Sequence, residues 1–244
     1  MDHVAQTISS GRIGDVERIF ADVSFAAPSY PEGHRMINPQ LGGGALLDLG
    51  VYSLTWVLHA IKALNQGRAT PRISSTMRKH AAGVDEQTTM VLTFPFEKGD
   101  VHAVATASIR VAGDPDRKGT AGPVIRIQGR EGEIAVFDPA FRPTRTQIVL
   151  RDGTFEEHAW TYPGPGPGSG WRNGPPHMPL AEGEGQGMFW EADECAYAIR
   201  DGRLESSVQS LAESIELARI MDEVRRQNDL VFPSEVESSE LLAG

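Results

Sequence analysis

The chain has 244 residues, of which 40% are hydrophobic and 23% are charged. These fractions are typical of a globular protein and exclude a disordered chain, and the length allows one large domain or two small ones. Acidic residues outnumber basic ones by 33 to 23, which argues against nucleic acid as a partner because phosphate backbones bind clustered lysine and arginine. The single cysteine, Cys195, excludes an internal disulfide and favours a cytoplasmic location.

The N-terminal part predicts a short helix and then a strand. Residues 4–8 have the apolar spacing of a helix, and Gly11 supplies the left-handed residue that closes one. Residues 16–25 follow as a strand in which Ile19, Ala21 and Val23 share one face.

The most hydrophobic stretch, residues 45–64, predicts a buried helix that follows the triplet Gly42-Gly43-Gly44. Asp48, His59 and Lys62 lie within it, and a membrane span would not tolerate these residues cheaply. We therefore expect no membrane as a partner.

From about residue 72 to residue 150 the pattern changes to strands. The alternation is clearest in residues 101–111, where Ala103, Ala105 and Ala107 share an apolar face, and further strands are expected at 88–96, 124–128 and 133–137. Short turns between consecutive strands favour an antiparallel meander. The predicted fold is α+β, with an open, mostly antiparallel sheet of about six strands and helices on one face.

The C-terminal part predicts a loop, two helices and a tail. Residues 162–187, rich in glycine and proline, are expected to form an exposed loop. The first helix has an apolar face with Cys195 as a packed thiol, and the second opens with a capping box of Ser210 and Glu213. Residues 234–244 are expected to be a frayed acidic tail.

Asp48 and Tyr52 are the candidate catalytic residues. Standing four apart on the predicted helix, they place a carboxylate and a phenol on one face, and Gly50 between them allows close approach of another segment or a ligand. The alternative is a core helix whose buried aspartate bonds to a loop, although an unpaired buried carboxylate is costly in a helix so apolar.

The loop before this helix and the histidines contain further candidate site residues. His34, Arg35 and Asn38 either face a substrate cleft or cofactor edge or form a solvated loop. The seven histidines have no His-x-x-x-His spacing, so no metal site is expected.

Three stretches resemble one enzyme family. The run from Gly42 to Trp56 is similar to the first helix of the C-terminal domain in the glucose-fructose oxidoreductase / inositol dehydrogenase / MocA (Gfo/Idh/MocA) family, and residues 8–16 and 188–206 agree with it. The form Asp48-x-Gly50-x-Tyr52 is similar to the branch with NADP-dependent D-xylose 1-dehydrogenase and dimeric dihydrodiol dehydrogenase; many other members have histidine where Tyr52 stands.

The resemblance implies an enzyme in which a Rossmann domain binds NADP and a C-terminal domain supplies the substrate wall and a homodimer face. Tyr52 would act at the substrate hydroxyl of a sugar or diol, and Asp48 would orient it. The family's Glu-Lys-Pro motif with its catalytic lysine and a Gly-x-Gly-x-x-Gly after a strand do not occur in this sequence. We therefore expect the C-terminal half of such an enzyme, inactive alone, with residues 1–14 as the end of a linking helix and residues 15–233 as the substrate and dimerisation domain.

Two other interpretations remain open. The chain is either a non-catalytic module that dimerises or binds through its apolar sheet face, or a truncated fragment of the full oxidoreductase.

Overall fold

The computed structural model describes residues 1–26, 29–67, 70–162, 164–172, 182–185 and 187–238. The chain divides into two compact units. We call Met1–His158 with Leu217–Gly244 the sheet unit, and Ala159–Glu216 the helical unit.

The sheet unit contains the following elements. Its helical elements are α1 (Asp2–Ser9), the short 3₁₀ turns η1 (Arg35–Ile37) and η2 (Pro39–Leu41), the π-helical turn η3 (Leu46–Gly50), α2 (Val51–Ala63), the C-terminal part of α4 (Leu211–Gln227) and α5 (Ser234–Glu237). Its strands are β1 (Val16–Ser24), β2 (Arg72–Lys79), β3 (Asp85–Phe94), β4 (Val101–Ser108), β5 (Ile125–Gly129), β6 (Gly132–Val136), β7 (Arg145–Leu150) and β8 (Phe155–Ala159).

The strands form one sheet in the order β2-β3-β4-β1-β5-β6-β7-β8. β1 lies between β4 and β5, parallel to β4 and antiparallel to β5, so the sheet is mixed and not a simple meander. The expected α+β class is confirmed, whereas the expected number of about six strands is wrong because the described residues form a sheet of eight. The polar strands β2 and β8 contain no buried residue, so their apolar alternation is weak.

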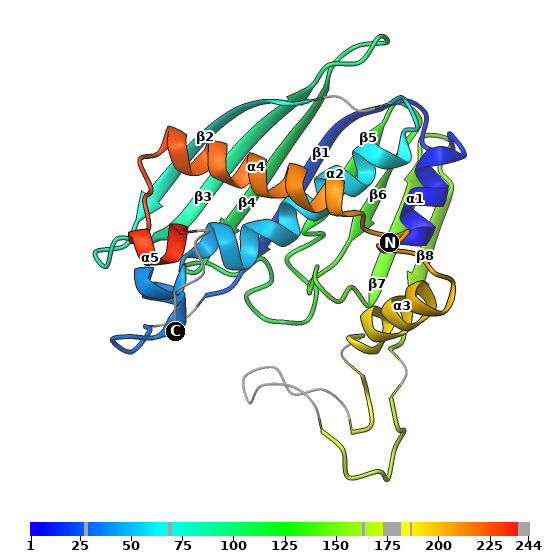
Figure 1. Ribbon diagram of the computed structural model, residues 1–244. Coiled ribbons are helices and arrows are strands. Elements are labelled where there is room, and N and C mark those ends of the chain that lie inside the picture. The colour runs from blue at the N-terminus through cyan, green and yellow to red at the C-terminus, as the bar shows by residue number, and fades with distance from the viewer. Residues whose placement is uncertain (27–28, 68–69, 163, 173–181, 186, 239–244) are drawn as a thin grey trace. The chain divides into compact units, whose positions relative to one another are not determined.

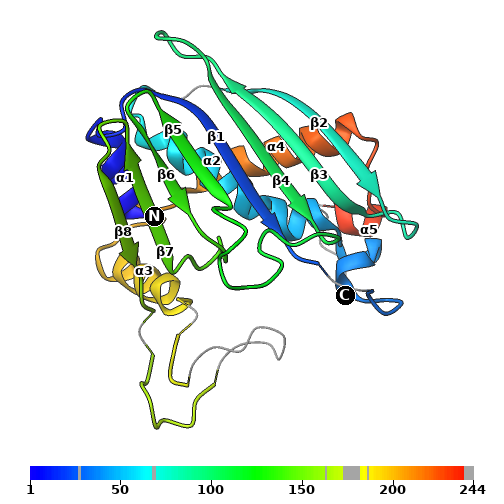
Figure 2. The ribbon, with the colours of Figure 1, turned by 180° about the vertical axis from the view of Figure 1, so that it is seen from behind.

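The helices of the sheet unit lie against one face of the sheet, which we call the covered face, and the strands are seen from the other, open face in Figure 2 (Figures 1 and 2). Small side chains on the covered face let α2 come close. Ala103, Ala105 and Ala107 of β4 are fully buried, and a side chain at Gly50 would lie 3.6 Å from the Ala107 Cβ. The close approach expected at Gly50 is therefore to β4.

This packing corrects the expected dimer face. The alternating alanines of β4 were expected to be an apolar surface for a second copy, but they face the helices of their own chain. Any homodimer through the sheet must use the open face instead.

The predicted helix over residues 45–64 begins as a π-turn. The helical run Pro39–Ala63 is long and apolar enough by composition to cross a membrane, but 61% of its most apolar window is buried within the protein. Its residues Leu54, Val57 and Ala60 belong to the core, as expected for a buried helix.

The two ends of the sheet unit are fixed by helices. α1 forms as predicted, with Val4 and Ile8 buried and Gly11 at φ +71° after it. At the C-terminal end Gln227 donates to the Ile73 carbonyl oxygen at 2.9 Å, and the Glu237 carboxylate pairs with Arg225. Residues 234–237 are thus a short helix and not a frayed tail, while residues 239–244 lie outside the described residues.

The helical unit contains α3 (Phe189–Arg200) and the beginning of α4. The predicted capping box is confirmed, because the Ser210 amide donates to Glu213 at 2.7 Å and the Glu213 amide donates to the Ser210 hydroxyl at 3.2 Å. The expected packing of Cys195 is wrong, since the thiol is exposed, and Ile199 of the same helix is 80% exposed. The described residues of 162–187 have neither helix nor strand; the rest of that predicted loop lies outside the described residues.

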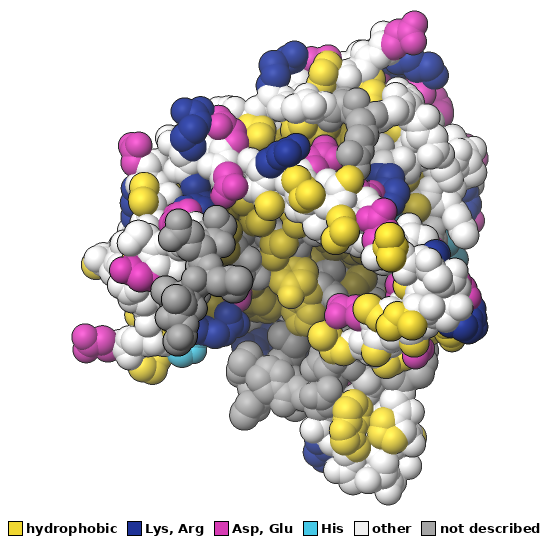
Figure 3. Space-filling view, in the orientation of Figure 1, with side chains coloured by type: hydrophobic (Ala, Val, Ile, Leu, Met, Phe, Trp, Pro, Cys, Tyr) yellow, Lys and Arg dark blue, Asp and Glu magenta, His cyan; other side chains and the backbone are white. Residues whose placement is uncertain are grey.

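Acidic and basic side chains are interspersed on the surface shown in Figure 3. Several of them form ion pairs, among them Arg226 with Glu223 at 2.6 Å. This mixing produces no large basic patch on the face shown, in keeping with the net charge of −10.

Candidate functional site

The glycine run before η3 folds the preceding loop back against the start of the helix. A Cβ at Gly43 would lie 2.4 Å from the backbone oxygen of Arg35, and the Gly43 amide donates to the Asn38 carbonyl oxygen at 3.0 Å. Only glycine permits this contact, because real Cβ atoms do not approach backbone atoms so closely. The contact places Arg35 beside the first turn of the helix.

A buried carboxylate fixes the other side of the helix start. Asp85 at the beginning of β3 is fully buried; its Oδ2 accepts a hydrogen bond from the Leu46 amide at 2.8 Å and one from the Thr88 hydroxyl at 2.7 Å. Burial raises the pKa of this carboxyl, and the hydrogen bonds oppose the rise. Asp85 therefore anchors the turn from which Asp48 projects, and nothing in the local sequence around Asp48 revealed it.

Asp48 lies in the π-turn and forms a two-point ion pair with Arg35. Arg35 Nη1 contacts Asp48 Oδ1, and Arg35 Nη2 lies 3.5 Å from Asp48 Oδ2. The hydrogen bond and then the charge of Asp48 raise the pKa of the Arg35 guanidinium, with smaller contributions from Tyr30 and Tyr52. π-turns recur at functional sites, and this one replaces the regular helical turn predicted here.

Tyr52, on the first turn of α2, lies beside two phenylalanines and close enough to Arg35 to influence the pKa of its guanidinium. Its ring centroid is 6.3 Å from that of Phe141, which is 5.9 Å from that of Phe25. The loop with Phe141 is held by Trp56, whose indole Nε1 donates to the Ala140 carbonyl oxygen at 2.9 Å. Tyr52 is 45% exposed and Phe141 37% exposed, so a ligand can reach both rings.

The other two predicted residues, His34 and Asn38, bond to backbone amides of their own loop. His34 Nδ1 accepts from the Met36 amide at 3.2 Å, and Asn38 Oδ1 accepts from the Gln40 amide at 2.9 Å, so these side chains cap η1 and η2. The structure therefore brings Arg35, Asp48 and Tyr52 together, and it assigns His34 and Asn38 to loop geometry.

A metal ion and the NADP pyrophosphate each need a particular set of groups. Among the described residues no group of three His, Cys, Asp or Glu could hold a metal ion. A pyrophosphate needs free amides at a helix start, but the Leu46 amide after the glycine run already bonds to the carboxylate of Asp85, which would repel phosphate. This helix start does not fit the NADP pyrophosphate. Arg35, Asp48 and Tyr52 are therefore candidate groups for binding a substrate and not for binding the nucleotide.

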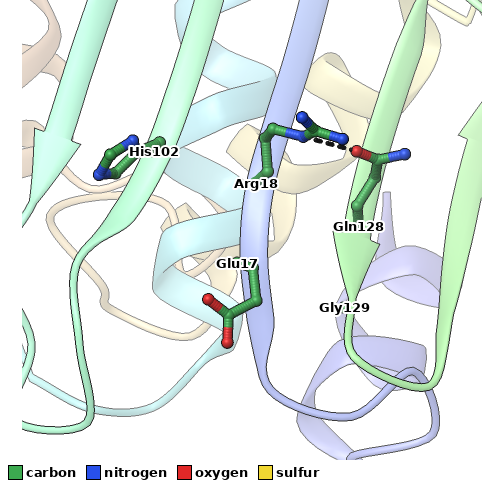
Figure 4. Close-up of a pocket in the computed structure, with 5 residues that line it drawn as sticks. All are labelled: Glu17, Arg18, His102, Gln128 and Gly129. Carbon is green, nitrogen blue, oxygen red and sulfur yellow. Dashed lines mark hydrogen bonds between the residues drawn. The ribbon is translucent and has the colours of Figure 1, made fainter.

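The open face of the sheet has a separate polar depression. It has a volume of about 450 Å³ and is lined by Glu17, Arg18, His102, Gln128 and Gly129. Arg18 Nε donates to Gln128 Oε1 at 2.8 Å across the pair β1–β5, and His102 is the register partner of Arg18 on β4 (Figure 4). The depression is shallow and has no aromatic wall. It is therefore a weaker candidate for ligand binding than the site formed by Arg35, Asp48 and Tyr52.

Comparison with curated proteins finds oxidoreductases. The chain is 38% identical over 239 residues to D-xylose 1-dehydrogenase (NADP(+)) from Hypocrea jecorina, with 94% of this chain and 57% of that protein covered. It is 28% identical to trans-1,2-dihydrobenzene-1,2-diol dehydrogenase from Bos taurus, over 96% of this chain and 60% of that protein. The chain thus spans less than two thirds of the length of these relatives.

Comparison with solved structures supports the fold. Aldose-aldose oxidoreductase from Caulobacter crescentus, solved with glycerol, has a TM-score of 0.65 and 16% identity; 93% of this chain and 57% of that one are covered. The family model described as GFO/IDH/MocA C-terminal domain matches residues 1–135, which is more than half of the chain. These matches confirm the resemblance inferred from Asp48, Gly50 and Tyr52, including the branch, and the chain belongs to the Gfo/Idh/MocA family.

Proposed function

We propose that this chain is the substrate-binding and dimerisation part of an NADP-dependent sugar dehydrogenase of the D-xylose 1-dehydrogenase type. The observation that carries the proposal is the two-point pair of Arg35 with Asp48 beside Tyr52, at the exposed end of a helix that is otherwise buried. The similarity to D-xylose 1-dehydrogenase (NADP(+)) supports the same substrate class.

Each group of the site has a task that suits a cyclic polyol. The Asp48 carboxylate, 28% exposed, can accept hydrogen bonds from sugar hydroxyls, and such bonds to a charged group are stronger than neutral ones. Phe141 and Phe25 offer an apolar surface to the C–H face of the ring. Oxidation of an alcohol also removes the hydroxyl proton, and we assign the contact with that hydroxyl to Tyr52.

NADP remains part of the proposal through the relatives alone. The helix start after Gly42–Gly44 does not fit its pyrophosphate, so we assign the nucleotide to residues other than those of this site. A cytoplasmic location is proposed on the single cysteine.

A homodimer through the open face of the sheet completes the proposal. Phe20, Val104 and Val91 are register neighbours on β1, β4 and β3 and form an apolar row across this face, beside the polar row that contains Arg18. A Val104→Glu variant should give the monomer mass in light scattering, whereas a His80→Glu variant, altered in the turn between β2 and β3, should keep the dimer mass. A monomeric parent protein contradicts this part of the proposal.

The substrate site is tested by binding of D-xylose to the chain, measured by saturation-transfer NMR titration. Asp48→Asn should weaken binding about tenfold or more, because a hydrogen bond to a charged acceptor contributes about 1.5–3 kcal/mol. Asp100→Asn is the matched control, since Asp100 also pairs with an arginine, Arg72 at 2.6 Å, just before β4 begins. No binding by the parent chain, or equal binding by both variants, would refute the proposed site.

A further inference from the structure

The loop that carries Phe141, residues 137–144 between β6 and β7, is held from two sides. On one side a tryptophan of α2 donates a hydrogen bond to the Ala140 carbonyl oxygen at 2.9 Å. On the other side Asp138, three residues before Phe141, is half-buried against the loop of residues 109–124 between β4 and β5. The position of Phe141 in the candidate site therefore depends on the surroundings of Asp138.

Gly113, in the loop between β4 and β5, lies between two carboxylates. A Cβ at Gly113 would be 2.9 Å from Asp22 Oδ2 and 3.8 Å from Asp138 Oδ1, so these oxygens approach one point from β1 and from the loop after β6. The Gly113 amide donates to the Ser24 carbonyl oxygen at 3.2 Å, which fixes the glycine at the end of β1. At this separation the two carboxylates repel each other when both are ionised.

Asp22 is fixed in place, and it does not move away from this contact easily. It belongs to β1, in the middle of the sheet, and its Oδ1 accepts hydrogen bonds from the Ser24 hydroxyl at 2.7 Å and from the Thr106 hydroxyl. Asp138 lies outside the strands, in a loop. Repulsion between the two groups therefore displaces Asp138 and not Asp22.

A third carboxylate adds to the negative charge of this region. Asp114 is 5% exposed, and its Oδ2 accepts from the Gly119 amide at 2.7 Å. Its Oδ1 is buried, and the described residues supply no hydrogen bond to it. Within those residues no three acidic, histidine or cysteine side chains are placed to hold a metal ion. A proton on one of the carboxyl groups therefore reduces the repulsion among them.

The charges near Asp138 come from three elements. Burial, then the charges of Asp114 and Asp22, raise the pKa of Asp138 to about 6, and Arg117 in the loop between β4 and β5 lowers it. From β7, Arg145 donates to a backbone oxygen of that loop at 3.2 Å and lies over an aromatic ring at 3.6 Å. Asp138 is thus the carboxyl group that exchanges its proton near neutral pH.

We propose that Asp138 is a positioning residue of the candidate site, which in its protonated form lies beside Asp22 and keeps Phe141 in contact with the ligand. Loss of the proton leaves three carboxylates together, and the loop of residues 137–144 moves away from β1 with its aromatic ring. The inference rests on the proposed function and adds a regulation to it, since ligand should bind more tightly at pH 5 than at pH 8.

The first test follows the Phe141 ring itself by NMR between pH 5 and pH 8, with its signals assigned from a Phe141→Leu variant. In the parent they should shift with a midpoint at about pH 6. In Asp138→Asn, whose side chain has no charge, they should stay where the parent has them at pH 5. Asp22→Asn should move the midpoint to lower pH, because one repelling charge is gone. Asp100→Asn, before β4, is the control and should titrate as the parent does.

The second test measures the affinity for D-xylose at pH 5 and pH 8 by saturation-transfer NMR titration. The parent should bind about two- to tenfold more weakly at pH 8, the contribution of one aromatic contact. Asp138→Asn should bind equally at the two pH values, with the affinity that the parent has at pH 5. A fall of the same size in Asp138→Asn would assign the pH dependence to another group.

The two tests separate this inference from the proposed function. If the Phe141 signals do not titrate, or titrate in Asp138→Asn as in the parent, the role of Asp138 is wrong whatever the sugar does. Equal affinity of the parent at both pH values also overturns it, while the site stands if Asp48→Asn weakens binding. If the parent binds no D-xylose at either pH, the proposed function fails and the inference fails with it.

Discussion

On strand β4, Ala103 and Ala105 are fully buried beneath the helices, whereas His102 and Val104, one residue along, point to the open face of the same strand. The same contrast holds on β1 between buried Ile19 and exposed Arg18. One face thus has to match the helices in volume and polarity, and the other is free to vary or to receive a partner. The candidate site lies where the covered face ends and α2 reaches solvent.

The largest effect expected from this contrast is between neighbouring residues. Ala105→Glu puts an unpaired charge beneath α2 and should lower the free energy of unfolding by more than about 4 kcal/mol. Val104→Glu changes the open face and should stay within about 1 kcal/mol of the parent monomer. Urea unfolding followed by circular dichroism measures both.

A cooperative transition of Ala105→Glu close to that of the parent would show that the two faces are not different in this way. The stability of Val104→Glu is also a control for the dimer test, since this variant must remain folded for its mass to be informative.

The second prediction concerns Asp85, a buried carboxyl group at the beginning of β3. Asp85→Ala removes the acceptor of the Leu46 amide and the Thr88 hydroxyl and should cost about 3 kcal/mol, because two buried donors lose their partner. Asp85→Asn keeps an oxygen at the position and should cost less. If both variants unfold at the same urea concentration, the hydrogen bonds accepted by Asp85 are not what stabilises the fold at this position.

The sequence revealed the parts of the molecule whose signal is local. Alternation located β1 and β4, Gly11 marked the end of α1, and Ser210 with Glu213 predicted the cap of α4. The edge strand β2 gives a weaker signal, because its inward-facing residues are only half-buried and include Ser75 between Ile73 and Met77.

The sequence predicted Asp48 of the candidate site, but it did not predict which residues contact or support it. An aspartate in an apolar helix marked Asp48, but its partner Arg35 is 13 residues away and reaches it only through the contact at Gly43. Asp85 comes from another element altogether. The exposure of Cys195 on α3 could not be predicted either, since helical periodicity indicates an apolar face but not whether anything covers it.

A third prediction uses a carboxyl group near the open-face residue Asp22. Burial, then the charges of Asp114 and Asp22, raise the pKa of Asp138 to about 6. A carboxyl whose pKa rises on folding stabilises the protein below its unfolded value near 4, and this contribution is lost as pH rises through 6. Asp138→Asn should therefore be more stable than the parent by about 2 kcal/mol at pH 8 and equal to it at pH 3.5, in urea unfolding at both values.

An unchanged difference between the two pH values would mean that the Asp138 carboxyl has the same pKa in the folded and unfolded chain. Asp152→Asn, in the turn between β7 and β8, is the control with opposite sign, because a hydrogen bond from the Thr154 amide lowers the pKa of Asp152.

The smallest effect is expected on the open face. Arg18 makes one hydrogen bond to Gln128 and lies over the Phe20 ring at 4.9 Å, and both contacts are exposed in the single chain. Arg18→Ala should therefore change the stability of the monomer by less than about 1 kcal/mol.

A homodimer through this face would bury Arg18, and its unfolding midpoint would then rise with protein concentration because association stabilises only the folded chain. Unfolding of parent and variant at a low and a high concentration separates the cases: equal shifts mean that Arg18 lies outside any interface, and a shift lost in the variant places the partner on the row that contains Arg18.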